Sequence, residues 1–166
     1  MLLGLSKIIG CPGSVVPFET NLDLSLMEFG GSKPLTEPVH AVGQVRNMAG
    51  VLVMTGELTT RLHGNCDRCA KPVKQDFAVS LEAVLVAELE NEDYDDPWTF
   101  ELVGDQADLD EILTTAVVLN MDSKMLCDED CKGLCSRCGA DLNDGPCSCK
   151  PELDPRLAVL QQLLNK

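Results

Sequence analysis

Aromatic side chains and long apolar runs are both scarce in this chain of 166 residues. Phe, Trp and Tyr make up 4% of the sequence although 45% is hydrophobic, so aliphatic side chains must supply most of a core. No apolar run approaches the roughly 20 residues that a helix needs to cross a bilayer. Near the N-terminus the single cation, Lys7, lies inside the apolar run and not ahead of it, which disfavours a secretory leader. We therefore expect no membrane segment and a cytoplasmic protein.

Basic residues are missing from the middle of the chain. Between Lys74 and Lys124 there is no Lys or Arg, whereas this stretch holds 14 acidic residues. The remainder has 13 acidic and 13 basic residues, so the whole formal charge of −14 lies in the middle. Such a run is typical of a solvated loop, and equally of an acidic surface that binds a basic partner. The composition leaves both interpretations open.

The sequence also lacks the usual motifs of catalysis. It has two histidines, His40 and His63, and neither a Gly-rich phosphate loop nor a G-x-S-x-G nucleophile motif. The carboxylates are concentrated in the acidic run, where they serve solvation more often than acid–base chemistry. Nothing here indicates a small-molecule substrate.

Cysteine is abundant, and eight of the nine fall into four close pairs. Eight thiolates match the ligand count of two tetrahedral zinc sites, which have no open coordination position and stabilise structure. Paired cysteines without a secretory leader are more often metal ligands than disulfides. We therefore predict two structural zinc sites. Their ligands are Cys135, Cys138, Cys147 and Cys149 in a compact site, and Cys66, Cys69, Cys127 and Cys131 in a site whose pairs are 57 residues apart.

Other interpretations of the cysteines stay open at this stage. An iron–sulfur cluster also uses four thiolates, disulfides form in oxidising compartments, and other pairings fit the spacing. His63 lies three residues before Cys66 and is an alternative ligand, although a strand or surface histidine is more common. A thioredoxin-like motif fits poorly, because strand patterns flank Cys66 and Cys69 on both sides where a helix should follow.

The first half of the chain alternates between apolar and polar residues, which predicts strands. Two of these strands form a hairpin around a turn at residues 47–50. Cys66 and Cys69 lie between the last two strands, at the tip of an antiparallel pair. The predicted strands are 18–26, 39–46, 52–62 and 73–85.

A charged loop, a short strand and a helix are expected next. Residues 88–97 are too charged to pack, and residues 98–103 resemble a short strand. Asp108 is a candidate N-cap, with Glu111 at the capping-box position. The apolar face of the following helix is predicted to contain Leu109, Ile112, Leu113, Ala116 and Leu119.

The last part of the chain contains the cysteine-rich segment, which is too small and polar to fold without cross-links. Asp154 and Pro155 then begin a tail helix. We predict an α+β protein. Its parts are an antiparallel β-rich body with the acidic segment and one central helix over residues 1–125, and a cysteine-rich, zinc-stapled loop module with a C-terminal helix over residues 126–166. Chelation, or Cys138→Ser, should unfold the second part first.

Several cations surround the cysteines, and they would form one patch if the two cysteine regions meet. Such a patch is a candidate contact for RNA phosphates. It equally suits compensation of the negative charge of metal thiolates. The cations are Arg61, Arg68, Lys71, Lys74, Lys132 and Arg137.

The ordered motifs resemble the YceD (DUF177) family, whose members are also called large ribosomal RNA subunit accumulation proteins. The resemblance covers residues 61–166. It rests on C-D-R-C-x-K-P, then L-D-E-I-L, then C-D-E-D-C-K-G-L-C-S-R-C-G-A-D-L-N with G-P-C-S-C, then D-P-R-L-A-V-L.

This resemblance implies a metal-binding factor that supports accumulation or processing of large-subunit (23S) ribosomal RNA, without established enzymatic activity. The expected partner is a large ribosomal subunit precursor or a basic ribosomal protein, with RNA contact through the cationic patch as a further expectation. Two alternatives stay open, namely a metal- or redox-dependent enzyme acting on RNA or a small substrate, and a zinc-stabilised scaffold without RNA contact.

Overall fold

The structure is a computed structural model that describes residues 1–87 and 96–149. Most of the predicted charged loop and the predicted tail helix lie outside these residues. The α+β class is confirmed. The elements are β1 (Leu2–Gly4), α1 (Ser6–Ile9), β2 (Val15–Leu22), β3 (Val39–Met48), β4 (Val51–Asn65), β5 (Pro72–Val86), β6 (Thr99–Glu101), β7 (Gln106–Asp108) and α2 (Leu109–Asn120).

One five-stranded sheet with the order β2-β3-β4-β5-β6 forms the body, and β1 pairs with β7 in a separate ribbon. Strands β2 to β5 are antiparallel neighbours. The β3–β4 hairpin and the antiparallel pair of β4 and β5 were predicted from the alternation. The turn between β3 and β4 consists of Ala49 and Gly50, both with positive φ (54° and 102°), as a type I′ hairpin turn requires. The sheet is mixed, because the short strand β6 runs parallel to β5, and sequence alternation carries no information on that direction.

Two details of the predicted elements are wrong. The first strand ends at Leu22, and Leu26 is 83% exposed. The reason is an Asx turn, in which Asp23 Oδ1 accepts the Ser25 N–H at 2.9 Å and ends the extended conformation. On α2, Leu119 is 51% exposed, and Val117 takes the predicted place of Leu119 on the buried face.

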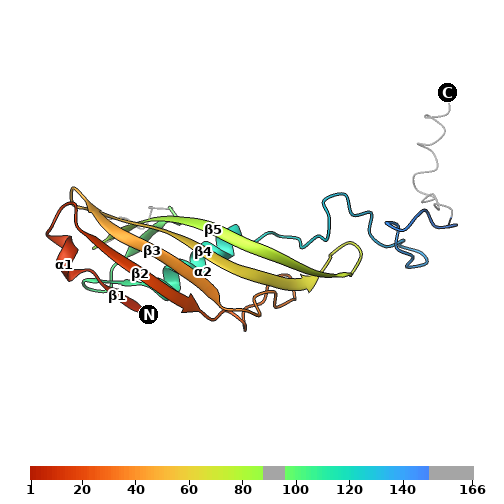
Figure 1. Cartoon of the computed structure of the whole chain (residues 1–166), viewed down its shortest axis with the longest axis horizontal. Coiled ribbons are helices and arrows are strands. Elements are labelled where there is room, and N and C mark those ends of the chain that lie inside the picture. The colour runs from red at the N-terminus through yellow and green to blue at the C-terminus, as the bar shows by residue number, and fades with distance from the viewer. Residues whose placement is uncertain (88–95, 150–166) are drawn as a thin grey trace, which may run out of the picture.

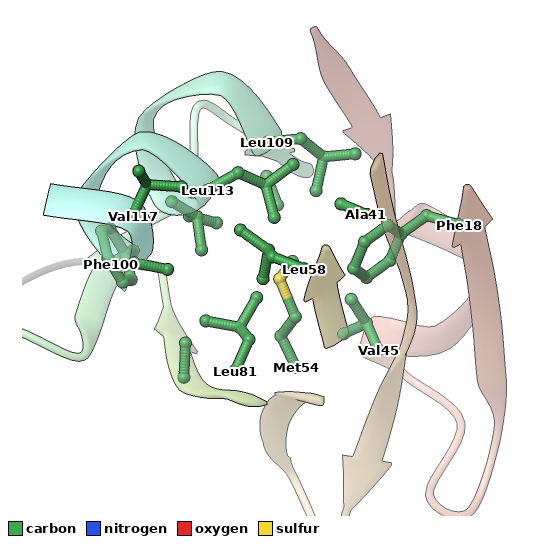
Figure 2. Close-up of a cluster of buried hydrophobic side chains, with 14 of the residues drawn as sticks. Phe18, Ala41, Val45, Met54, Leu58, Leu81, Phe100, Leu109, Leu113 and Val117 are labelled. Atoms are coloured by element: carbon green, nitrogen blue, oxygen red, sulfur yellow. The ribbon is translucent and has the colours of Figure 1, made fainter. Parts of the chain in front are cut away.

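Helix α2 covers one face of the sheet and closes the core. Its N-cap is Asp108, whose carboxylate accepts the Asp110 N–H at 3.0 Å, as expected. Figure 2 shows Leu113 of the helix above Leu58 of β4, with both side chains in the aliphatic core. Because α2 covers one face of the sheet, the exposed residues in the alternating pattern of β2 to β5 point to the other face.

The hairpin of β4 and β5 is the longest feature of the sheet, with 15 residues in each strand. Figure 1 shows it projecting past the end of α2. Beyond Thr59, β4 pairs only with β5 among the described residues, and Cys66 and Cys69 follow at this hairpin tip. Among residues 1–87 and 96–149, no helix combines the length and the apolar character needed to cross a membrane.

Candidate metal centres

The first tetrad consists of Cys66 and Cys69 at the hairpin tip, with Cys127 and Cys131 from the segment after α2. The four sulfurs lie within 4.8 Å of one another. Sγ of Cys66 is 3.8 Å from that of Cys131, and Sγ of Cys69 is 3.5 Å from that of Cys127. Four sulfurs bonded at about 2.3 Å to one tetrahedral metal are separated by about 3.8 Å. The arrangement therefore fits a single ion.

Backbone N–H groups around Cys66 favour its thiolate form. The N–H groups of Cys127, Cys69 and Arg68 point at its sulfur and lower the pKa of the Cys66 thiol to about 6. The opposite holds for Cys127, because the neighbouring sulfur of Cys69 above all raises its pKa to about 12. The pKa of the Cys131 thiol is also lowered, above all by the side-chain amide of Asn143. Thiolates are therefore favoured at Cys66 and Cys131 and opposed at Cys127, and a bound cation would offset the negative charge of all of them.

The second tetrad, Cys135, Cys138, Cys147 and Cys149, has the same organisation. The N–H groups of Cys138 and Arg137 lower the pKa of Cys135 to about 6. The sulfur of Cys138 raises the pKa of Cys149 to about 12. Here too the four sulfurs lie within 4.8 Å. Both predicted groups of cysteines are thus brought together, and each could hold one metal ion.

Contacts between backbone and side chains attach the second half of the first tetrad to the hairpin. Asp67 exchanges two hydrogen bonds with Met125, through its N–H (2.8 Å) and its carboxylate (2.7 Å). The guanidinium of Arg68 donates to the carbonyls of Glu129 (3.0 Å) and Cys131 (2.8 Å). Arg68 was predicted as a phosphate contact or as compensation of thiolate charge, but its bonds to these carbonyls and the role of Asp67 were not predicted. These contacts position Cys127 and Cys131 opposite the hairpin.

The six predicted cations do not form one free patch. Arg61 is paired with Asp76 across the hairpin at 2.9 Å. The Lys71 ammonium lies 2.7 Å from a carboxylate oxygen of Asp141, and Arg68 is bonded to the carbonyls described above. Lys74 and Lys132 are also exposed. Arg137 lies in the second tetrad, where its N–H contributes to the environment of Cys135.

Several alternatives from the sequence fit the geometry less well. The sulfur separations of 3.5 and 3.8 Å are far beyond a disulfide bond of about 2.05 Å, and all nine cysteines are free. Sulfurs within 4.8 Å leave room for one ion and not for a multi-iron cluster. His63 is not a fifth candidate ligand, because its Nε2 lies 2.8 Å from the Glu37 carboxylate instead.

Acidification should release metal from both tetrads. The pKa of Cys66 and of Cys135 is lowered to about 6, below the usual thiol value of about 8.5. The stabilisation from these thiolates is therefore complete above the usual value and is lost as the pH falls through about 6. We expect metal content, measured after gel filtration at a series of pH values, to be constant at pH 7–8 and to fall at or below about pH 6.

The matched control for acid release is Cys11→Ser, because Cys11 is exposed and belongs to neither tetrad. This variant should release metal over the same pH range as the unchanged protein. Retention of all metal down to pH 4, or release on raising the pH, would contradict the thiolate environment described above.

Comparison with known proteins adds an independent finding. The family model described as "Large ribosomal RNA subunit accumulation protein YceD" matches residues 54–164. An uncharacterized protein of Mycobacterium tuberculosis and one of Mycobacterium bovis are each 29% identical to this chain, over 90% of it and 70% of the relative. A chloroplastic large ribosomal RNA subunit accumulation protein YCED homolog of Zea mays is 26% identical, over 90% of this chain and 61% of the relative. No solved structure matches the chain.

Proposed function

The chain belongs to the YceD family, and we propose that it is a noncatalytic, metal-stabilised factor in ribosome biogenesis that supports accumulation or processing of large-subunit ribosomal RNA. The observation that carries this proposal is the family match over residues 54–164. The matched range includes all of the β4–β5 hairpin except the first three residues of β4, and all eight tetrad cysteines. The family is named for the accumulation of an RNA and not for a catalysed reaction.

The metal we propose for both tetrads is zinc. Four thiolates are a usual structural zinc set, and they occupy every position of a tetrahedral ion. Such an ion has no site for water or substrate, so its role is to hold the segment after α2 on the hairpin. This closed coordination argues against a metal-dependent enzyme. In addition, backbone N–H groups engage the thiolates of Cys66 and Cys135.

The surface that we propose for a basic protein partner is the open face, defined as the face of β2 to β5 that points away from α2. Glu19, Val42 and Glu57 are cross-strand neighbours there. Glu82 lies on the same face, opposite Thr55 of β4. All of these side chains are exposed. Acidic groups on an exposed surface attract a cationic partner and are stabilised by it.

Direct RNA contact is not the primary interaction that we propose. Arg61, Arg68 and Lys71 already have intramolecular partners, which leaves few exposed cations near the first tetrad. The formal charge of −14 also repels a phosphate backbone. We therefore place the primary contact on protein, within a large ribosomal subunit precursor in the cytoplasm.

The experiment that tests this function is depletion of the protein from its host, followed by complementation. Depletion should lower large-subunit relative to small-subunit ribosomal RNA, and the unchanged chain should restore the ratio. A triple variant, Glu19→Gln, Glu57→Gln and Glu82→Gln, should restore it poorly and should lose capture of basic ribosomal proteins at low salt. An unchanged ratio on depletion would contradict the function itself.

The matched control is a second triple variant that removes the same three charges elsewhere. Asp105→Asn, Glu111→Gln and Asp122→Asn change exposed acids of the acidic segment that do not lie on the open face. This variant should complement normally. Equal failure of both triple variants would show that total acidity matters and not the open face.

A further inference from the structure

The loop enclosed by the second tetrad reaches the first tetrad. It lies between Cys138 and Cys147, and its middle packs on the segment that carries Cys131. Leu142 donates its N–H to the Gly133 carbonyl at 2.9 Å, and Leu134 donates to the Arg68 carbonyl at 3.0 Å. A chain of backbone contacts therefore runs from the second tetrad to the hairpin tip.

Asn143, in the middle of this loop, contacts a sulfur of the other tetrad. Its Nδ2 donates to Cys131 Sγ at 3.4 Å and to Asp141 Oδ1 at 2.7 Å. Its Oδ1 accepts the Lys132 N–H at 2.8 Å. The amide orientation is determined by these partners, because the reverse orientation would set oxygen against a carboxylate and a sulfur. Asn143 therefore presents a fixed N–H donor to a ligand of the first tetrad.

An ion pair reinforces the same junction. The Lys71 ammonium, two residues beyond Cys69, lies 2.7 Å from Asp141 Oδ2 and 4.0 Å from Asp144 Oδ1. Asp141 also accepts the backbone N–H of Asn143 at 2.9 Å, and its side chain is 14% exposed. Lys71 of the hairpin therefore fixes Asp141, and Asp141 in turn fixes Asn143. Gly133 lets the segment that carries Cys131 approach the hairpin closely, because a Cβ at this position would lie 2.8 Å from the Arg68 carbonyl oxygen.

We propose that Asn143 couples the two metal centres, so that metal in the second tetrad raises the affinity of the first tetrad for metal. The inference rests on the proposal that both tetrads hold metal. Metal in the second tetrad closes the loop and fixes Asn143, whose N–H then stabilises the Cys131 thiolate in the first. Hydrogen bonds to metal ligands typically change metal affinity by about 10–100-fold. Because coupling between sites is reciprocal, metal in the first tetrad raises the affinity of the second by the same factor.

The test compares Asn143→Asp, Cys135→Ser with Cys138→Ser, and the combination of all three changes. Zinc-loaded full-length protein is titrated with a chelator, and the freed cysteines are alkylated and identified by peptide mass spectrometry. This readout follows Cys66 separately from the second tetrad. We expect each change to weaken zinc retention at Cys66 by about 10-fold, and the combination to weaken it no further, since both act through one contact.

The matched control is Asn65→Asp, which adds the same charge beside Cys66 without removing a donor to a sulfur. Asn65 is exposed, and no hydrogen bond of its side chain is present among the described residues. Hydrogen-exchange protection of β3 verifies folding of each variant. Asn65→Asp should weaken zinc retention at Cys66 by less than a third as much as Asn143→Asp does. Equal effects, or additive losses in the combination, would overturn the coupling while leaving two metal sites intact. A protein that binds no metal would overturn the metal centres as well.

Discussion

Gly43→Ala is expected to destabilise the fold by about 3 kcal/mol or more, because the added methyl group meets backbone atoms that cannot move aside. A Cβ at Gly43 would lie 2.4 Å from the Thr55 carbonyl oxygen and 2.8 Å from Gly56 Cα. It would also lie 2.7 Å from the ring of Phe18. Gly43 and Gly56 are cross-strand partners in the centre of the sheet, and the aromatic ring fills the space that two side chains would take.

The measurement is chemical denaturation of Gly43→Ala beside Gly4→Ala. Gly4 is the matched control, since it also lies in a strand but nothing lies within 4 Å of the position of its Cβ. The control should change the free energy of unfolding by less than about 1 kcal/mol. Equal stability of the two variants would contradict the packing of Phe18 on the glycine pair.

Removal of metal is expected to free the segment after α2 and leave the sheet folded. A structural zinc contributes about 10–16 kcal/mol in zinc-finger peptides. Residues 127–149 contribute two cysteines to the first tetrad, Cys127 and Cys131, and all four cysteines of the second tetrad. Cys66, Cys69 and Cys131 form a small cluster separate from the main core. The main core consists of side chains from the sheet, α1, α2 and adjoining segments, so it does not depend on the ions.

Hydrogen exchange with and without chelator is the measurement. Amides of residues 127–149 and of the hairpin tip should lose protection, whereas those of β3 should keep it. Cys138→Ser should expose the second tetrad in the same way without chelator, and Cys11→Ser should not. This experiment also tests the proposed division of the chain near residue 125. A single cooperative unfolding transition that chelator does not change would contradict both the division and the role of the metal.

Local periodicity was sufficient to predict much of the body. Alternation identified β3, β4 and β5 with their hairpins, and the N-cap residue Asp108 identified the start of α2. It was insufficient where a side chain interrupts the pattern, as Asp23 does after β2. The parallel direction of β6 was also missed, since the three residues of this strand carry no information on the direction in which it runs.

The paired cysteines, the acidic charge and the family motifs could be identified without a structure, because residue types and short spacings are local properties. The folded chain was needed to show that Cys66 lies beside Cys131, that Arg68 and Lys71 have intramolecular partners, and that Asn143 contacts a sulfur of the first tetrad. Such contacts join residues 12 to 70 positions apart. They depend on how the long β4–β5 hairpin projects beyond α2, and no short stretch of sequence carries that information.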